Sequence, residues 1–370
     1  MATPCIYYLL SRLAVYAAAI MASWLLPSIH PFSALGSSWD GGWYIKIAQH
    51  GYPTHLFQEG AGSRWAFFPA WPLAIRGFGI LTGFSLADAA TILAFLFGLT
   101  SAITIWLAVQ AHLGRQIADR AVLFYVFFPM ALVLSMGYTE GLFLTAAGAC
   151  LYAISRRWWL IAALSAIVGS LTRDAGAILI VAVVIAALSE LRQHRGVRPT
   201  LAVLIAPLGL AVFMAYSWMR VGTPVAFLTA EKYWNGGAHF VWFRTPIVAL
   251  SVVLRAGTHG VQLPGSDFAA IALVFAYVGI TLMVRFRRGG TQIPTHWWIY
   301  TIGVVLVGFS AYTPTSILRY TMAAFPLFAA YSWKLKPKWD GAVVGLMACA
   351  QGALTIVVLA AFVHLLPIYP

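Results

Sequence analysis

The sequence predicts an all-α polytopic membrane protein, and its composition is the first reason. Of the 370 residues, 61% are hydrophobic and only 9% are charged, with a mean hydropathy of +0.84. About a quarter of the residues of a soluble domain are charged, and one soluble core could not bury this much apolar surface. The apolar runs are continuous over about 15–25 residues, which suits membrane helices and not barrel strands. A soluble globular enzyme, a disordered chain and a nucleic-acid-binding protein are therefore excluded.

The basic residues predict the topology. The formal net charge is +13, and 13 of the 23 lysines and arginines gather in five short clusters between apolar runs. Under the positive-inside rule, such clusters belong to cytoplasmic loops. The clusters are Arg115 and Arg120; Arg156 and Arg157; Arg192, Arg195 and Arg198; Arg285, Arg287 and Arg288; and Lys334, Lys336 and Lys338.

Eleven spans bring all five clusters to one side of the membrane. We expect these spans at about 6–26, 88–112, 121–137, 141–155, 158–172, 176–190, 201–219, 267–284, 297–311, 321–333 and 340–364. The segments 27–87 and 220–263 then form outer loops of a single integral domain, residues 1–370. The apolar stretch 67–85 contains several prolines and glycines, so we expect a helix that lies at the outer interface or dips into the membrane and returns, and we expect the same of 246–258.

The few acidic residues point to the outer side. Seven of the ten carboxylates fall there in this topology, beside isolated cations such as Arg173 and Arg319. Ionisable groups at the ends of spans are costly and tend to mark function. The sequence therefore predicts an outward-facing active site or binding cavity.

The segment 39–52 is the most informative local pattern. Asp40 precedes two glycines, so the backbone there can approach a ligand closely. The aromatic rings of Trp39, Trp43 and Tyr44 beside a carboxylate suit a sugar, whose C–H faces stack on rings while its hydroxyls bond to the acid. Asp40 as a helix N-cap, and the aromatics as an interfacial belt, remain alternatives.

Five segments in order resemble the GPI mannosyltransferase II (PIG-V) family and its prokaryotic relatives. They are WDGGWYIKIAQHGY at 39–52, FFPAWP at 67–72, GYTEGLF at 137–143, LTRDAG at 171–176, and the pairs Arg319-Tyr320 and Phe325-Pro326. The family belongs to the GT-C glycosyltransferases. The resemblance implies a GT-C-type bundle with membrane-surface helices in the first outer loop. It also implies an extracytoplasmic active site and a polyprenyl-phosphate-linked sugar donor, with mannose as the sugar.

The resemblance also implies roles for the charged residues. Asp40 would be the catalytic base of a single inverting displacement, taking the proton of the attacking hydroxyl. Charge develops on the leaving phosphate, so cations should bind it. Arg319 and Arg173 are the first candidates, followed by Lys46 and Arg64, although Arg319 as an interfacial anchor is an alternative.

Further residues are candidates for binding substrate. They are Trp39, Trp43, Tyr44, His50, Tyr138 and Glu140. A structural ion pair is the alternative role for Glu140, and that of an ordinary polar loop residue for His50.

No cofactor is required by these patterns, although a divalent metal held by Asp40 and Glu140 is an alternative. The expected partners are the lipid-linked donor, an acceptor glycan, glycolipid or protein, and the bilayer, with no nucleic acid. The expected location is a prokaryotic plasma membrane with the active site facing outward. A polytopic transporter or lipid-carrier translocase is the alternative function, disfavoured because no internal repeat is visible.

Overall fold

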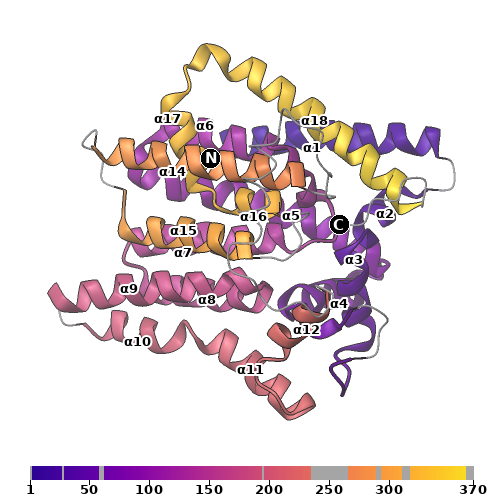
Figure 1. Ribbon diagram of the computed structural model, residues 1–370, viewed down its shortest axis with the longest axis horizontal. Coiled ribbons are helices and arrows are strands. Elements are labelled where there is room, and N and C mark those ends of the chain that lie inside the picture. The colour runs from indigo at the N-terminus through magenta and orange to yellow at the C-terminus, as the bar shows by residue number, and fades with distance from the viewer. Residues whose placement is uncertain are drawn as a thin grey trace.

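The computed structural model describes residues 2–26, 29–57, 62–193, 196–234, 266–288, 293–310 and 317–363. Every regular element in these ranges is a helix, and many of the long helices run along the longest dimension of the molecule (Figure 1). The predicted all-α class is therefore confirmed. The stretch 246–258, expected on the membrane surface, lies outside the described residues.

A group of short helices follows the long helix α1 (Ala2–Leu25). They are α2 (Pro31–Ser37), α3 (Asp40–His50), η1 (Arg64–Ala66) and α4 (Ala70–Thr82). Trp39, at a φ of 49°, redirects the chain between α2 and α3. Gly51 and Gly83 end α3 and α4 at φ values of 68° and 75°, a conformation that glycine adopts without strain. These turns fold the described residues 29–57 and 62–85 into a cap at one end of the bundle.

Helix α4 occupies the stretch in which we expected a surface helix. Its 13 residues extend about 20 Å, which is less than the roughly 30 Å thickness of a bilayer's hydrocarbon core. Leu73, Ile80 and Leu81 on this helix are exposed. The helix is thus too short to cross a bilayer alone, and its position on the membrane surface stays a proposal.

The centre of the bundle contains a bent helix pair. Helix α5 (Leu86–Leu113) leads into α6 (Arg115–Phe127), and η2 (Pro129–Ser135) follows at an angle of 78°. Pro129 explains the bend, because proline lacks the N–H that would continue the helix and restricts the residue before it.

Buried side chains from distant helices satisfy the backbone at this bend. Arg12 is fully buried and donates from Nη1 to the carbonyl of Ala131 at 2.8 Å and from Nη2 to that of Val126 at 3.2 Å. The amide of Gln351 donates to the carbonyls of Val126 and Phe128. Carbonyl groups that the helix leaves open thereby gain partners, and the bend is held rigidly.

The remaining helices complete the bundle. They are α7 (Glu140–Ser155), α8 (Trp159–Thr172), η3 (Asp174–Gly176), α9 (Ala177–Gln193), α10 (Val197–Ile205), α11 (Leu208–Val221), α12 (Ala226–Trp234), α14 (Ser266–Arg288), α15 (Thr295–Ser310), α16 (Ile317–Ala323), α17 (Pro326–Lys334), η5 (Pro337–Trp339) and α18 (Asp340–Phe362).

Helices occupy all the segments in which a span was predicted, but not every one has the length of a span. Among the described residues, five helices are long and apolar enough to cross a membrane, or six with the bent pair counted as one. Helices α7 and α8 are apolar but shorter. The structure therefore supports a membrane protein with several spans, and the number eleven is not established.

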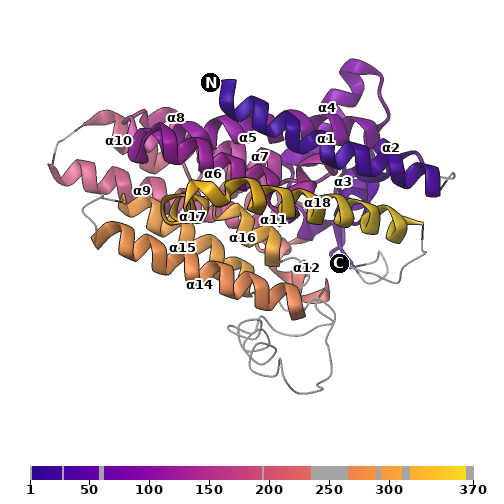
Figure 2. The same ribbon diagram turned by 90° about the horizontal axis from the view of Figure 1, so that it is seen from above.

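The two ends of the bundle carry different groups. Figures 1 and 2 place α2, α3, α4 and α12 at one end, and the last turn of α9 with the first turns of α10 and α15 at the opposite end. At that opposite end Arg157 lies 3.4 Å from Glu190 of α9. Arg157, Arg192 at the end of α9 and Arg198 at the start of α10 are members of the basic clusters, and they lie far from the cap that carries Asp40.

Candidate active site

Close backbone contacts bring Asp40 to its neighbours. Asp40 is the first residue of α3, and a Cβ added to Gly41 would overlap the carbonyl of Gly36 in α2. A Cβ on Gly137 would overlap the same carbonyl, and the amide of Gly137 donates to the carbonyl of Leu35 at 3.0 Å. Only glycine fits at these two positions. The contacts draw the start of α3 against the segment that leads into α7.

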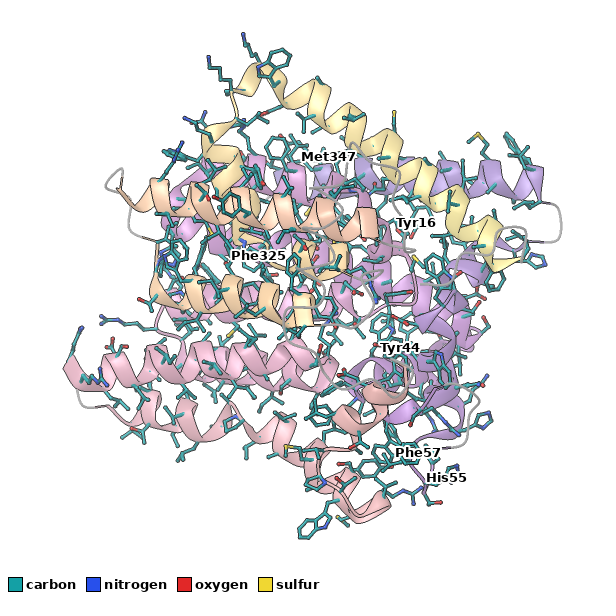
Figure 3. All side chains as sticks on the ribbon, in the orientation of Figure 1. Tyr16, Tyr44, His55, Phe57, Phe325 and Met347 are labelled. Atoms are coloured by element: carbon teal, nitrogen blue, oxygen red, sulfur yellow. The ribbon has the colours of Figure 1, made fainter. Side chains whose placement is uncertain are left out.

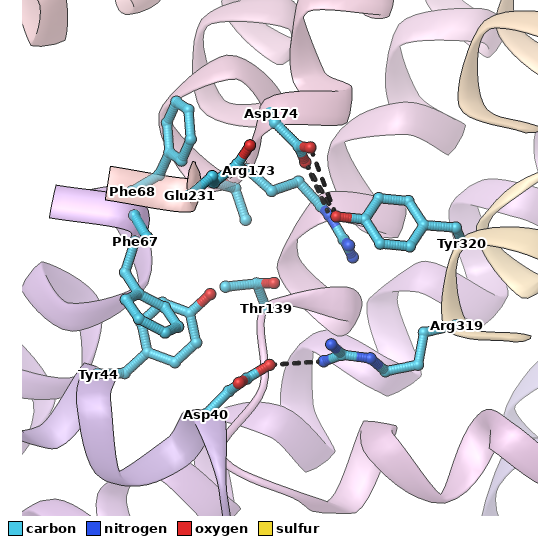
Figure 4. Close-up of a pocket in the computed structure, with 12 residues that line it drawn as sticks. Asp40, Tyr44, Phe67, Phe68, Thr139, Arg173, Asp174, Glu231, Arg319 and Tyr320 are labelled. Atoms are coloured by element: carbon cyan, nitrogen blue, oxygen red, sulfur yellow. Dashed lines mark hydrogen bonds and ion pairs between the residues drawn. The ribbon is translucent and has the colours of Figure 1, made fainter. Parts of the chain in front are cut away.

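The resulting pocket has a volume of about 100 Å³ and is lined mainly by polar and aromatic side chains (Figure 4). The lining residues are Asp40, Tyr44, Ala66, Phe67, Phe68, Thr139, Thr172, Arg173, Asp174, Glu231, Arg319 and Tyr320. They come from the cap, from the starts and ends of α7, α8 and η3, and from α12 and α16, so the site is assembled from distant parts of the chain.

Arg319 and Asp40 form the first ion pair of the site. Nη1 of Arg319 donates to Oδ2 of Asp40 at 2.9 Å. The guanidinium also lies over the ring of Tyr138, with 4.7 Å between its central carbon and the ring centroid. The Asp40 side chain is 27% exposed, so the carboxylate remains open to the pocket.

Glu140 forms ion pairs with both Arg173 and Arg319. Its side chain is fully buried, with Oε1 2.9 Å from Nη1 of Arg173 and 3.6 Å from Nη1 of Arg319. Within the described part of the chain, Oε2 of Glu140 has no hydrogen-bond partner. A buried carboxylate between two guanidiniums is well compensated in charge, and removing any member would leave the others uncompensated.

A second acidic group lies across the pocket. The hydroxyl of Tyr320 donates to Asp174 at 3.3 Å, and Arg173 lies 4.3 Å from the centroid of the Tyr320 ring. Glu231, in the short helix α12 outside the candidate spans, faces the same space. Burial, and to a lesser extent the Asp174 carboxylate, raise the pKa of Glu231 to about 8, while Arg173 opposes this rise.

The charges of the site do not balance when every group is ionised. Four carboxylates, those of Asp40, Glu140, Asp174 and Glu231, face two guanidiniums, which leaves a formal charge of −2. Protonation of Glu231 reduces that charge to −1. The protonation state of Glu231 therefore affects how readily an anion enters.

A larger apolar cavity adjoins the pocket. It has a volume of about 370 Å³, and its walls come mostly from apolar residues of α9, α11, α12 and α15. Phe68, Asp174 and Glu231 line both spaces. The small polar pocket and the larger apolar cavity therefore lie next to each other and share three lining residues.

The structure brings together part of the residue set chosen from the sequence. Four of the chosen residues line the pocket, namely Asp40, Tyr44, Arg173 and Arg319. Two more, Glu140 and Tyr138, contact these arginines but do not line the pocket. The other candidates lie outside the lining. They are Trp39, Trp43, Lys46, His50 and Arg64.

These outer candidates have other neighbours. Lys46 is exposed and lies 4.6 Å from the ring centroid of Trp43. Arg64 donates to the carbonyl of Gly51 at 2.7 Å, and His50 is exposed at the end of α3. Figure 3 shows Tyr44 toward the middle of the molecule and the neighbouring loop, with His55 and Phe57, near its edge.

Three ionisable residues of the lining, Asp174, Glu231 and Tyr320, were not chosen as site residues from the sequence. Asp174 and Tyr320 stand directly beside Arg173 and Arg319, so their place in the same segments was the available sign. Glu231 belongs to the predicted outer loop 220–263, and no local sequence pattern ties it to Asp174.

A metal site is not evident in the part of the chain described. No group of three or more histidine, cysteine, aspartate or glutamate side chains is arranged there to hold an ion. Asp40 and Glu140, the pair considered for a divalent cation, instead share the guanidinium of Arg319.

Comparison with solved structures shows the fold. The apo oligosaccharyltransferase of Archaeoglobus fulgidus matches with a TM-score of 0.51 and 12% identity over 95% of this chain and 56% of that one. The same enzyme tethered to an acceptor peptide matches with a TM-score of 0.50 and 13% identity, over 95% and 55%. The chain thus spans little more than half the length of these relatives.

A weaker likeness, with a TM-score of 0.41, is to apo ArnT from Cupriavidus metallidurans, at 14% identity over 93% of this chain and 77% of that one. No curated protein sequence matches the chain. The sequence profile of the mannosyltransferase (PIG-V) family, however, matches residues 28–223, which is more than half of the 370 residues. The matched region contains Asp40, Glu140 and Arg173, three of the charged groups of the pocket. The chain therefore belongs to the mannosyltransferase (PIG-V) family.

Proposed function

We propose that this membrane glycosyltransferase moves mannose from a polyprenyl-phosphate donor to an extracytoplasmic acceptor by a single inverting displacement. The observation that carries the proposal is the Asp40–Arg319–Glu140–Arg173 network at the wall of a pocket that adjoins an apolar cavity. A carboxylate base, two phosphate-binding cations and space for a lipid chain are what this reaction needs.

The donor fits the two joined spaces by its chemistry. Its phosphate would bind the guanidiniums of Arg319 and Arg173, since planar forks of donors suit phosphate oxygens. Its isoprenoid chain would lie in the apolar cavity beyond Phe68, where burial of the chain is favourable. The sugar would then occupy the polar pocket beside Tyr44 and Asp40.

The reaction step balances with the groups present. The acceptor hydroxyl oxygen attacks the anomeric carbon and loses its proton to the Asp40 carboxylate. The bond between the anomeric carbon and the phosphate oxygen breaks, and its electron pair stays on that oxygen. Arg319 and Arg173 stabilise the developing charge, and attack opposite to the leaving group inverts the anomeric centre.

Arg319 links donor binding to the base. In the structure one oxygen of Asp40 accepts a hydrogen bond from Arg319. A phosphate that takes up Arg319 would weaken this hydrogen bond, which would raise the affinity of Asp40 for the hydroxyl proton once the donor is in place.

The orientation is supported by the distribution of charge. The pocket lies at the end of the bundle opposite to the last turn of α9, where Arg157 lies near Glu190. Basic clusters prefer the cytoplasmic side. We therefore propose that the pocket faces the outside of a prokaryotic plasma membrane, and that the acceptor is a glycan, glycolipid or protein there.

The test is transfer by the purified protein from a radiolabelled polyprenyl-phosphate mannose to candidate acceptors in sealed vesicles. Labelled acceptor formed without any ion gradient, and at the same rate with and without a chelator, supports the proposal. Movement of the intact donor across the vesicle membrane without transfer would instead identify a translocase. Asp40→Asn is the matched control, since it keeps the size of the side chain and removes the base.

A further inference from the structure

A second apolar space lies further along the face of α3 that carries Asp40. It is a groove of about 430 Å³, within the roughly 300–1,000 Å³ range of ligand pockets. Its walls include Ile47, Tyr52, Leu73, Val212 and Tyr216, from α3, the residues after it, α4 and α11. Leu73 and Val212 are 64% and 62% exposed, so the groove opens to the outside of the bundle.

Arginines border this groove. Arg76 of α4 lines it directly and is exposed. Arg220, one turn beyond Tyr216 in α11, is also exposed and donates to the carbonyl of Tyr52 at 3.1 Å. Among the described residues no carboxylate lies within ion-pair distance of Arg76 or Arg220. The two guanidiniums therefore give the rim of an apolar groove a positive charge.

The apolar wall and the two arginines at the rim indicate which class of ligand the groove would bind. An apolar wall takes a hydrocarbon chain, and two arginines at its rim suit a phosphate group. Tyr52 and Tyr216, whose ring centroids are 5.9 Å apart, are of the type that lies at the level of lipid headgroups. The ligand should thus be a lipid that carries a phosphate.

The lipid-linked donor is the less suitable occupant. Phe68, Asp174 and Glu231 connect the catalytic pocket to the other apolar cavity, whereas the groove has no lining residue in common with the pocket. A donor bound in the groove would hold its sugar away from Asp40.

We propose that the groove binds an anionic phospholipid of the surrounding bilayer. An acyl chain packs against Ile47, Leu73 and Val212, and the phosphate is bound by Arg76 and Arg220. The inference needs the chain to lie in a bilayer but does not need sugar transfer.

Lipid retention measured by native mass spectrometry tests this site. The protein is released from detergent that contains equal amounts of dioleoyl-phosphatidylglycerol and dioleoyl-phosphatidylcholine. We expect the parent chain to retain phosphatidylglycerol preferentially. In the double variant Arg76→Gln, Arg220→Gln this retention should weaken by roughly 30-fold, because each arginine near an anionic lipid contributes about a fivefold factor.

The matched control removes two exposed arginines from the opposite end, with Arg192→Gln and Arg198→Gln, and should retain the lipid like the parent. Val212→Trp fills the groove without changing its charge and should weaken retention of both lipids. Unchanged phosphatidylglycerol retention in the Arg76, Arg220 double variant overturns the proposal. Displacement of the lipid by equimolar polyprenyl phosphate would also overturn it, since the groove would then belong to the donor. Because the readout is binding, either failure leaves the proposed transferase activity standing.

Discussion

The guanidinium of Arg319 donates a hydrogen bond to the carboxylate of Asp40 at 2.9 Å, although 279 residues separate the two in the chain. The same Nη1 atom lies 3.6 Å from Glu140. Arg319 therefore stands between the candidate base and the buried carboxylate, at the point where a phosphate would bind. In the proposed reaction, the guanidinium that pairs with Asp40 would also bind the leaving phosphate.

Replacing Arg319 tests its role as the phosphate ligand. Arg319→Ala should lower turnover by roughly 10²–10³, because one preorganised donor to a developing anion has that effect. Arg319→Lys should restore only part of the rate, since a point charge does not replace a fork of donors. Radiolabel transfer measures both, with Arg198→Ala at the opposite end as the control. A folded Arg319→Ala variant with the parent rate would make Arg319 an interfacial anchor.

Glu140 should act by holding the arginines and not by contacting substrate. It does not line the pocket, yet it pairs with both Arg173 and Arg319. Glu140→Gln should therefore lower both the melting temperature and turnover. Residues of one network are not independent, so the effects of Glu140→Gln and Arg173→Gln on turnover should overlap in the double variant.

The measurement is a double-mutant cycle on the transfer rate. If the losses from Glu140→Gln and Arg173→Gln simply multiply, the two side chains act separately and the network has no functional role. Thr200→Ala, on the exposed part of α10, is a control for the assay.

Glu231 should make donor binding depend on pH. With its pKa raised to about 8, the carboxyl is mostly neutral below pH 8 and becomes charged as the pH rises through that value. The added negative charge beside Asp174 repels the donor phosphate, so KM for the donor should rise above pH 8. In Glu231→Gln this rise should disappear. A KM profile that is identical in both proteins would show that Glu231 does not titrate in this range.

Cysteine accessibility tests the orientation. In a chain without its native Cys5, Cys150 and Cys349, we expect an impermeant thiol reagent to label Gln49→Cys in intact cells. Gln116→Cys should be labelled only after permeabilisation, since it lies beside the basic residue Arg115. Both glutamines are exposed, so burial does not explain a difference between them. Labelling of Gln116→Cys from outside would invert the topology.

Much of the helical framework follows from the sequence, because continuous apolar runs determine where helices form. The charged residues predicted to lie on the outer side were also informative. Asp40, Arg173 and Arg319 come from separate segments, yet an isolated ionisable group beside an apolar span needs compensation, and here they compensate one another through Glu140.

Helical periodicity explains one difference between the residues chosen from the sequence and those in the pocket. With 3.6 residues per turn, Tyr44 lies on the same face of α3 as Asp40, whereas Lys46 points away from it. Lys46 accordingly lies exposed beside Trp43, and not among the residues that line the pocket.

Contacts between distant parts of the chain determine the features that no local sequence pattern predicts. The position of Glu231 opposite Asp174 depends on how α12 returns to the cap. The bend between α6 and η2 is marked by Pro129, but its stabilisation by Arg12 comes from a helix more than a hundred residues earlier in the chain. The short helix α4 could be recognised by its prolines and glycines, whereas the groove beside it could not.

The transfer rate of Asp40→Asn tests the central claim most directly. The variant keeps the size of the side chain and its ability to accept a hydrogen bond from Arg319, but asparagine cannot take the proton of the acceptor hydroxyl. A positioned base contributes about 10²–10⁴ in rate, so turnover should fall by that factor while donor binding persists. Asp40→Glu should restore little, because the added methylene displaces the carboxylate by about 1 Å. Turnover of a folded Asp40→Asn variant at the parent rate would contradict the account, and the base would have to be sought elsewhere in the pocket.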